Sequence, residues 1–254
     1  MPYINAFRIE EIDSGEYYAQ LPIVRLLQEK GWFRFNSPVT FFVGENGSGK
    51  STLLEALAVC AGMNAEGGSR NFTFATKRTE SGLHRYISLA RGARERDSFF
   101  LRAESFYNVA TEIERLDETA AAMLADAPQF LISAPPVRDY FGGKSLHEQS
   151  HGESFLFMVQ NRLSGGLYIL DEPEAALSPT RQMTLLVEFQ RLINAGAQLI
   201  IATHAPILLA FPGAEIYEIT DEGIARMAYE DCDHVRVTKR FLNDPQGMVR
   251  RLME

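Results

Sequence analysis

The sequence predicts an α/β protein with a mostly parallel sheet core, a small antiparallel β subdomain and a helical subdomain. Residues 167–170 are a continuous apolar run, which is typical of a strand buried on both faces of a parallel sheet, and 198–202 is expected to be a second buried strand. Segments of helical composition alternate with these strands and with an earlier strand at 39–43, and such alternation produces parallel sheets with right-handed crossovers. A chain of 254 residues is long enough for one such domain, so we expect a single domain over 1–254.

Local composition predicts the other elements in order. The glycine-rich loop after 39–43 leads into a helix at 52–59. Two strands, 84–90 and 98–103, flank a polar turn and suggest a small β hairpin. Residues 105–127 have helical composition.

The second half is expected to continue with helices and one edge hairpin. Residues 153–163 are very apolar and predict a buried helix, so we expect the helical subdomain to occupy about 105–163. Residues 180–195 form an amphipathic helix that ends at Gly196. From about Gly213 the sequence predicts an edge hairpin and a C-terminal helix with flanking basic residues.

Composition and charge narrow the functional classes. The net charge of −8 argues against a surface that coats nucleic acid. The longest apolar stretch, 199–211, is interrupted by Thr203 and His204 and is too short to span a membrane. The N-terminus resembles no export signal, so a cytoplasmic location is expected. Cys60 and Cys232 are the two cysteines and are expected to be reduced thiols, with no zinc site.

A phosphate-binding loop is the strongest local motif. The segment after the strand at 39–43 matches GxxxxGK[ST] and leads into a helix, the context that this motif requires. Its backbone N–H groups and the helix N-terminus would surround the β-phosphate, Lys50 would reach the β- and γ-phosphates, and Ser51 would ligate Mg²⁺. ATP and Mg²⁺ are therefore the expected cofactors. The nucleotide-binding residues expected here are Gly44, Glu45, Asn46, Gly47, Ser48, Gly49, Lys50, Ser51 and Thr52.

Two adjacent carboxylates follow the buried strand at 167–170. Asp171 is placed to hold the metal ion, and Glu172 is the candidate base for the attacking water. Two acidic residues at a strand end can also cap the next helix, although the phosphate-binding loop favours the catalytic reading. The 121 residues from Lys50 to Asp171 are too many for a small GTPase or a compact nucleotide kinase.

With these motifs in this order, residues 39–206 resemble the ABC ATPase family. The segment Gln149-Ser150-His151-Gly152-Glu153 looks like the family signature, usually LSGGQ, and Ser150 and Gly152 match it. It is also a capping box, in which Ser150 and Glu153 would open a helix without further function. The resemblance implies that Ser150, Gly152 and Glu153 contact nucleotide held by a second subunit, and hence a homodimer with two shared sites.

The resemblance implies roles for two further residues. His204 lies 33 residues beyond Asp171, at the end of a strand, and matches the histidine that senses the γ-phosphate in this family. Together with Glu172 it is a candidate catalytic residue. Glu104 occupies the position where the family normally has glutamine, and it would contact the metal ion or the water.

The family subtype and the partner are expected from finer features. Ser178 and Pro179 follow the carboxylates where transporter subunits usually have aspartate, so the chain is closer to the SMC-like and OLD-like soluble AAA ATPases. These act on nucleic acid or on partner proteins; a membrane permease is the less favoured partner. The alternatives are a transporter subunit and a non-hydrolysing, ATP-dependent switch. Phe33 and Phe35 are candidates for adenine stacking, although core packing is the more ordinary role.

One basic segment stands out in an acidic chain. Residues 77–102 carry a charge of +4, which leaves −12 for the rest. A solvated charged face is the ordinary explanation, and a nucleic-acid contact is the alternative. The basic residues are Lys77, Arg78, Arg85, Arg91, Arg94, Arg96 and Arg102.

Overall fold

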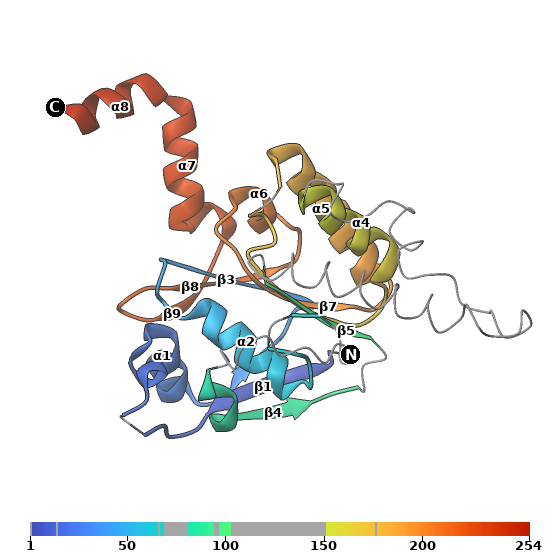
Figure 1. The fold of residues 1–254 in the computed structure, drawn as a ribbon. Helices are drawn as coiled ribbons and strands as arrows, with labels where there is room; N and C mark the ends of the chain where they lie inside the picture. Colours follow the sequence, from blue (N-terminus) through green and yellow to red (C-terminus); the bar gives the residue numbers. More distant parts are fainter. Residues whose placement is uncertain are drawn as a thin grey trace, which may run out of the picture.

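A six-stranded sheet forms the centre of the molecule (Figure 1), with the strand order β5-β6-β7-β3-β8-β9. The computed structural model describes residues 2–13, 15–65, 67–68, 81–93, 97–102, 151–175 and 177–254. Five strands are parallel and only the edge strand β9 is antiparallel, so the predicted mostly parallel core is confirmed. The strands are β3 (Val39–Gly44), β5 (Ser98–Arg102), β6 (Leu167–Asp171), β7 (Gln198–Ala202), β8 (Glu215–Ile219) and β9 (Ile224–Met227).

Helices cover both faces of this sheet (Figure 1). Phe41 on β3 belongs to the core on the side of α4 and α5, whereas Phe42 belongs to the core on the side of α1 and α2. Successive side chains of a strand point to opposite faces, and both faces are covered, so every residue of β3 is buried. The helices are α1 (Pro22–Lys30), α2 (Lys50–Cys60), α4 (His151–Arg162), α5 (Pro179–Asn194) and α6 (Pro206–Leu209).

A separate three-stranded antiparallel sheet consists of β2 (Phe33–Arg34), β1 (Ile4–Ile9) and β4 (Ile87–Arg91), in that order. It is the small antiparallel subdomain, but the predicted hairpin between 84–90 and 98–103 is wrong. β4 pairs with β1, and β5 instead pairs in parallel with β6. The first four residues of β5, Ser-Phe-Phe-Leu, are all buried, which suits a strand of a sheet that is covered on both faces; β4 is only half-buried.

Gln198 at the start of β7 connects the two sheets. Its side-chain amide donates to the carbonyl of Ile4 at 2.9 Å. Its Oε1 accepts from the backbone N–H groups of Tyr3 and Ile4 at 2.8 and 2.9 Å. Gln198 is 2% exposed, so the end of β1 is held by hydrogen bonds that water does not replace.

The C-terminal part contains two helices where the sequence predicts one. The edge hairpin β8–β9 is confirmed, and α7 (Asp233–Asn243) and α8 (Pro245–Met253) follow it. Asp244 separates the helices because its side chain accepts from the N–H of Gly247 at 2.9 Å, and Pro245 occupies the first position of α8. Both helices project from the layers of the domain (Figure 1).

Three short 3₁₀ helices complete the described elements: η1 (Tyr17–Gln20), η2 (Gly82–Tyr86) and η6 (Tyr229–Asp231). Within the described residues, no helix combines the length and the apolar character needed to cross a membrane.

Candidate functional site

The phosphate-binding loop lies at the carboxyl edge of the central sheet, between β3 and α2. Gly47 and Gly49 have φ values of 84° and 93°, which residues with a side chain rarely adopt. A Cβ on Gly44 would lie 2.7 Å from the carbonyl oxygen of Ile219, so the loop also needs glycine where it passes β8. These glycines allow the backbone to curve around an anion at the N-terminus of α2.

Lys50 opens α2 and folds back into the loop. It is only 5% exposed, and its Nζ donates to the carbonyl oxygens of Gly44 at 2.7 Å and Glu45 at 3.0 Å. Burial lowers the pKa of Lys50, while the nearby carboxylates of Glu172 and Asp171 act in the opposite direction. Nζ also lies 3.4 Å from the hydroxyl of Ser48, and a buried ammonium held by such neutral oxygens can bind phosphate oxygens as a point charge.

Ser51, at the end of the phosphate-binding loop, contacts Asp171, although the two residues are 120 positions apart in the sequence. The hydroxyl of Ser51 donates to Oδ1 of Asp171 at 3.0 Å. Burial raises the pKa of Asp171 to about 6, opposed mainly by the Ser51 hydrogen bond and by the charge of Arg102.

A buried carboxylate beside a hydroxyl fits a Mg²⁺ ion, which binds few protein oxygens and completes its shell with water and phosphate. No group of three or more His, Cys, Asp or Glu side chains within the described parts of the chain could form an all-protein metal cage. The donor set therefore suits a metal ion that arrives with nucleotide.

Arg102 is part of this site and not of a free basic surface. Its Nη1 lies 2.9 Å from Oε2 of Glu55, whose side chain is 6% exposed, and its Nε lies 3.9 Å from Oδ2 of Asp171. Strand register explains the second contact, because Arg102 on β5 is paired with Asp171 on β6. Arg91, on β4, donates to the carbonyl of Cys60 and lies in the other sheet.

Glu172 follows Asp171 in an unusual backbone conformation. Its φ of 50° makes it the only residue other than glycine with positive φ among those described, and such a conformation costs on the order of 1 kcal/mol. Its N–H donates to the carbonyl of Ala202 at 2.9 Å. The side chain is 43% exposed, and Oε1 lies 3.6 Å from Nε2 of His204. The structure therefore brings the two candidate catalytic side chains together.

Glu174 is a residue of the site that the sequence reasoning did not identify. Its Oε1 accepts from the hydroxyl of Thr203 at 2.6 Å and from the backbone N–H of His204 at 2.7 Å. Burial raises the pKa of Glu174, and these two hydrogen bonds oppose that effect. Because Glu174 lies in the turn after β6 and His204 follows β7, the carboxylate fixes the distance between the two turns. An acidic residue three positions after Asp171 was the available signal.

His234 is the second residue that was missed. It lies in the first turn of α7, and its Nε2 is 3.0 Å from Nδ1 of His204. The two rings are 5.0 Å apart between centroids and are inclined by 49°. The pKa of His204 is lowered by burial first and then by the charges of Lys50 and His234. No sequence motif points to this contact.

The other predicted site residues are only partly described. Glu104 and Ser150 lie outside the described residues, as do 105–127. Gly152 and Glu153 lie in the first turn of α4, which confirms the helix expected at 153–163.

Phe33 and Phe35 are core residues. They are 1% and 5% exposed, and they pack with each other and with Phe7 at centroid distances of 5.2 to 5.8 Å. Neither presents a face to a nucleotide, so the candidate stacking role is wrong for both. Phe33 also packs against Phe42 on β3 and Tyr217 on β8, at centroid distances of 5.5 and 4.7 Å, so both phenylalanines belong to the core that the two sheets share.

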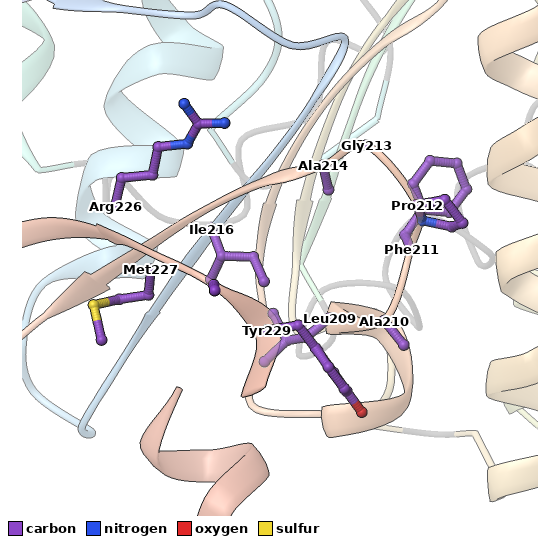
Figure 2. A pocket seen from close by; sticks show the side chains of 11 residues that line it. Leu209, Ala210, Phe211, Pro212, Gly213, Ala214, Ile216, Arg226, Met227 and Tyr229 are labelled. Atoms are coloured by element: carbon purple, nitrogen blue, oxygen red, sulfur yellow. The ribbon is translucent and has the colours of Figure 1, made fainter. Parts of the chain in front are cut away.

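Two cavities differ in chemistry. One, with a volume of about 330 Å³, is lined by residues of the phosphate-binding loop, by the end of β8 and by His234. Another, of about 660 Å³, lies between the end of α6 and β9 (Figure 2). Its lining is mostly apolar, and its only charged residue, Arg226, is paired with Glu215 at 3.2 Å. The first cavity adjoins the phosphate-binding loop, and the carboxylates of Glu45, Glu218, Asp221 and Asp233 also line it.

Two family models match parts of the chain that contain residues of this site. A family model described as an AAA domain matches residues 24–119, which include the phosphate-binding loop. A second AAA domain model, whose description adds AbiEii toxin and Type IV TA system, matches 154–210, which include Asp171, Glu172 and His204. No curated protein gives a significant match.

Solved structures with an overall likeness include a nucleotide-free ATP-binding cassette from an ABC transporter. It is 16% identical, with 97% of each chain covered and a TM-score of 0.49. Another is cbiO1 from Clostridium perfringens, part of the ABC transporter complex cbiONQ. It is 17% identical, with 100% of this chain and 99% of that chain covered and a TM-score of 0.45.

Proposed function

We propose that this chain, an ABC-type P-loop ATPase, binds ATP with Mg²⁺, hydrolyses it and uses the reaction to drive a conformational change in a partner protein. The observation that carries the proposal is the contact of 3.0 Å between Ser51 and Asp171. It joins a phosphate-binding loop to a buried carboxylate from a distant strand. A magnesium nucleotide requires both.

Each polar group at the carboxyl edge of the central sheet is assigned a role in ATP binding or hydrolysis. The loop and Lys50 would bind the β- and γ-phosphates, while Ser51 and Asp171 would hold the metal ion that neutralises developing charge. Glu172 would orient the attacking water and accept its proton, because it is the exposed carboxylate next to the metal ligand. His204, 3.6 Å from Glu172, would contact the γ-phosphate.

Hydrolysis is proposed to occur in a homodimer. The side chains of Glu172 and His204 are 43% and 26% exposed, so they can face a second subunit. The first turn of α4, which carries Gly152 and Glu153, is the candidate to complete the partner's site. We favour the SMC-like and OLD-like subtype because Ser178 stands where transporter subunits usually have aspartate; its Oγ caps α5 by accepting from the N–H of Arg181.

The proposed partner is a protein. Arg91 on β4 and Arg102 on β5 lie in different sheets, which argues against a single basic hairpin that follows a nucleic-acid backbone; Lys77, Arg78, Arg94 and Arg96 lie outside the described residues. Arg102 is moreover paired with Glu55. The choice can be checked by measuring ATPase activity at low salt with and without double-stranded DNA, which we expect to have no effect.

The function is tested with Lys50→Ala and Glu172→Gln. Lys50→Ala should lose nucleotide affinity. Glu172→Gln should bind ATP as the wild type does but hydrolyse it about 10²- to 10⁴-fold more slowly, the usual contribution of a general base. With ATP, light scattering should show Glu172→Gln as a species of about twice 28.5 kDa. The measurements are steady-state phosphate release, binding of a fluorescent ATP analogue and molar mass.

The matched control is Glu222→Gln, an exposed carboxylate in the β8–β9 turn, which should behave as the wild type. Turnover by Glu172→Gln close to that of the wild type would exclude Glu172 as the base. ATP binding and dimerisation without hydrolysis in the wild type would instead identify a non-hydrolysing switch.

A further inference from the structure

We propose that His234 is a positioning residue that fixes the tautomer of His204, so that the proton of the His204 ring lies on Nε2. The inference deepens the proposed function, because it concerns the residue expected to meet the γ-phosphate. It rests on the distance of 3.0 Å between Nδ1 of His204 and Nε2 of His234.

Two imidazole nitrogens at this distance share one hydrogen atom. A neutral imidazole has one donor and one acceptor nitrogen, so one of the two rings donates and the other accepts. If His204 donates from Nδ1, its Nε2 has only a lone pair. If His234 donates from Nε2, then Nδ1 of His204 accepts and Nε2 of His204 carries the proton.

The surroundings of His204 select the second arrangement. Nε2 of His204 faces Oε1 of Glu172 at 3.6 Å, and a carboxylate oxygen attracts an N–H and repels a lone pair. Nε2 of His204 is buried and has no hydrogen-bond partner among the described residues, so its hydrogen-bonding capacity is unused in the nucleotide-free protein. The proton on Nε2 therefore satisfies both neighbours of the ring.

The backbone around both histidines limits their movement. The N–H of His204 is fixed by Glu174 at 2.7 Å, and the N–H of Asp233 donates to Oε1 of Glu218 at 3.0 Å. The first turn of α7 is thus attached to the end of β8, beside the phosphate-binding loop. His234 also lines the cavity at that loop.

The tautomer matters because phosphate oxygens accept hydrogen bonds and cannot donate them when ionised. Only a protonated Nε2 can donate to a γ-phosphate oxygen, and a lone pair there would repel it. A group that orients a histidine through its other nitrogen commonly changes activity about 10- to 100-fold when removed. Helix α7 would therefore contribute to hydrolysis through His234, by orienting the ring of His204.

The experiment reads the tautomer directly in nucleotide-free protein. Histidine is labelled with ¹⁵N at both ring nitrogens, and NMR spectra are recorded for the wild type, His234→Gln, His234→Met and Arg236→Met; His204→Asn identifies the signals of His204. We expect Nε2–H in the wild type and in His234→Gln, whose amide N–H replaces the donor. His234→Met should give a mixture of tautomers. Arg236→Met, an exposed position on the same helix, should match the wild type.

Phosphate release is measured on the same proteins. His234→Met should lower kcat about 10- to 100-fold with KM for ATP little changed, and His234→Gln should restore most of it. A proton on Nδ1 of His204 in the wild type, or an unchanged tautomer in His234→Met, would overturn the inference. Absence of ATPase activity in the wild type would refute the proposed hydrolysis alone, because the NMR result does not depend on turnover. Thermal unfolding of each variant shows whether it still folds. If His234→Met does not fold, the comparison of His234→Gln with the wild type tests the inference.

Discussion

Replacing Gln198 by Met tests whether a single side chain holds the antiparallel sheet to the central one. Methionine has a similar length but can neither donate to nor accept from the end of β1. The change leaves the N–H and the carbonyl of Ile4 without partners, and Ile4 is 2% exposed. Each buried backbone group without a partner costs about 1–3 kcal/mol, so the two together cost about 2–6 kcal/mol. The N–H of Tyr3 is only partly buried and adds less.

The assay is unfolding by heat and by urea, followed by circular dichroism. In a chain of this size 1 kcal/mol shifts Tm by about 2–4 °C, so a loss of about 4 kcal/mol lowers Tm by about 8–16 °C. Gln190→Met is the control. Gln190 is exposed on α5 and donates only to Asn194 at 3.0 Å, so the change should stay within about 0.5 kcal/mol. Equal Tm values for the two variants would refute the argument that Gln198 joins the sheets.

Three further predictions follow from buried polar groups. Arg102→Met leaves the carboxylate of Glu55 buried without its counter-charge and should cost about 3 kcal/mol, the lower part of the usual range because Arg102 is 26% exposed; an unchanged urea midpoint would contradict this. Glu174→Gln keeps an oxygen for both hydrogen bonds and removes a carboxyl group whose pKa is raised in the fold. A carboxyl group with a raised pKa makes the wild type less stable as pH rises from the pKa in the unfolded chain to the pKa in the fold. The Tm of the variant minus that of the wild type should therefore increase from pH 4 to pH 8. A constant difference would argue against a raised pKa of Glu174. Burial raises the pKa of Cys232 to about 11 and leaves the side chain 0% exposed, so iodoacetamide at pH 8 should label it only after unfolding, which mass spectrometry measures.

The central part of the fold and of the site could be predicted because its signals are local. The phosphate-binding loop is one continuous segment whose glycines, lysine and serine have fixed spacing. Asp171 is identified by the buried strand directly before it. Parallel strands place their carboxyl ends at one edge, so the approach of Ser51 to Asp171 follows once both elements are recognised.

The antiparallel sheet could not be predicted in the same way. Strand pairing depends on which partner covers a strand, and β4 and β5 are separated by only six residues, which suggests a hairpin. The first four residues of β5 are nevertheless buried in the central sheet, and β4 pairs with β1, more than 70 residues earlier in the chain. The apolar content of Phe99 to Leu101 was the signal that distinguishes the two strands.

Two residues of the site could not be identified from sequence motifs. Glu174 and His234 belong to no pattern with fixed spacing. They contact different parts of His204, Glu174 the backbone N–H and His234 the ring. Their partners lie 30 residues away in each case, and helical periodicity or strand alternation predicts nothing about such contacts. The position of α7 is therefore the part of the site that only the folded structure supplies. If His234 fixes the His204 tautomer, a movement of α7 would alter the hydrogen bond between His234 and His204. The nitrogen of His204 that is expected to meet the γ-phosphate would then change its protonation.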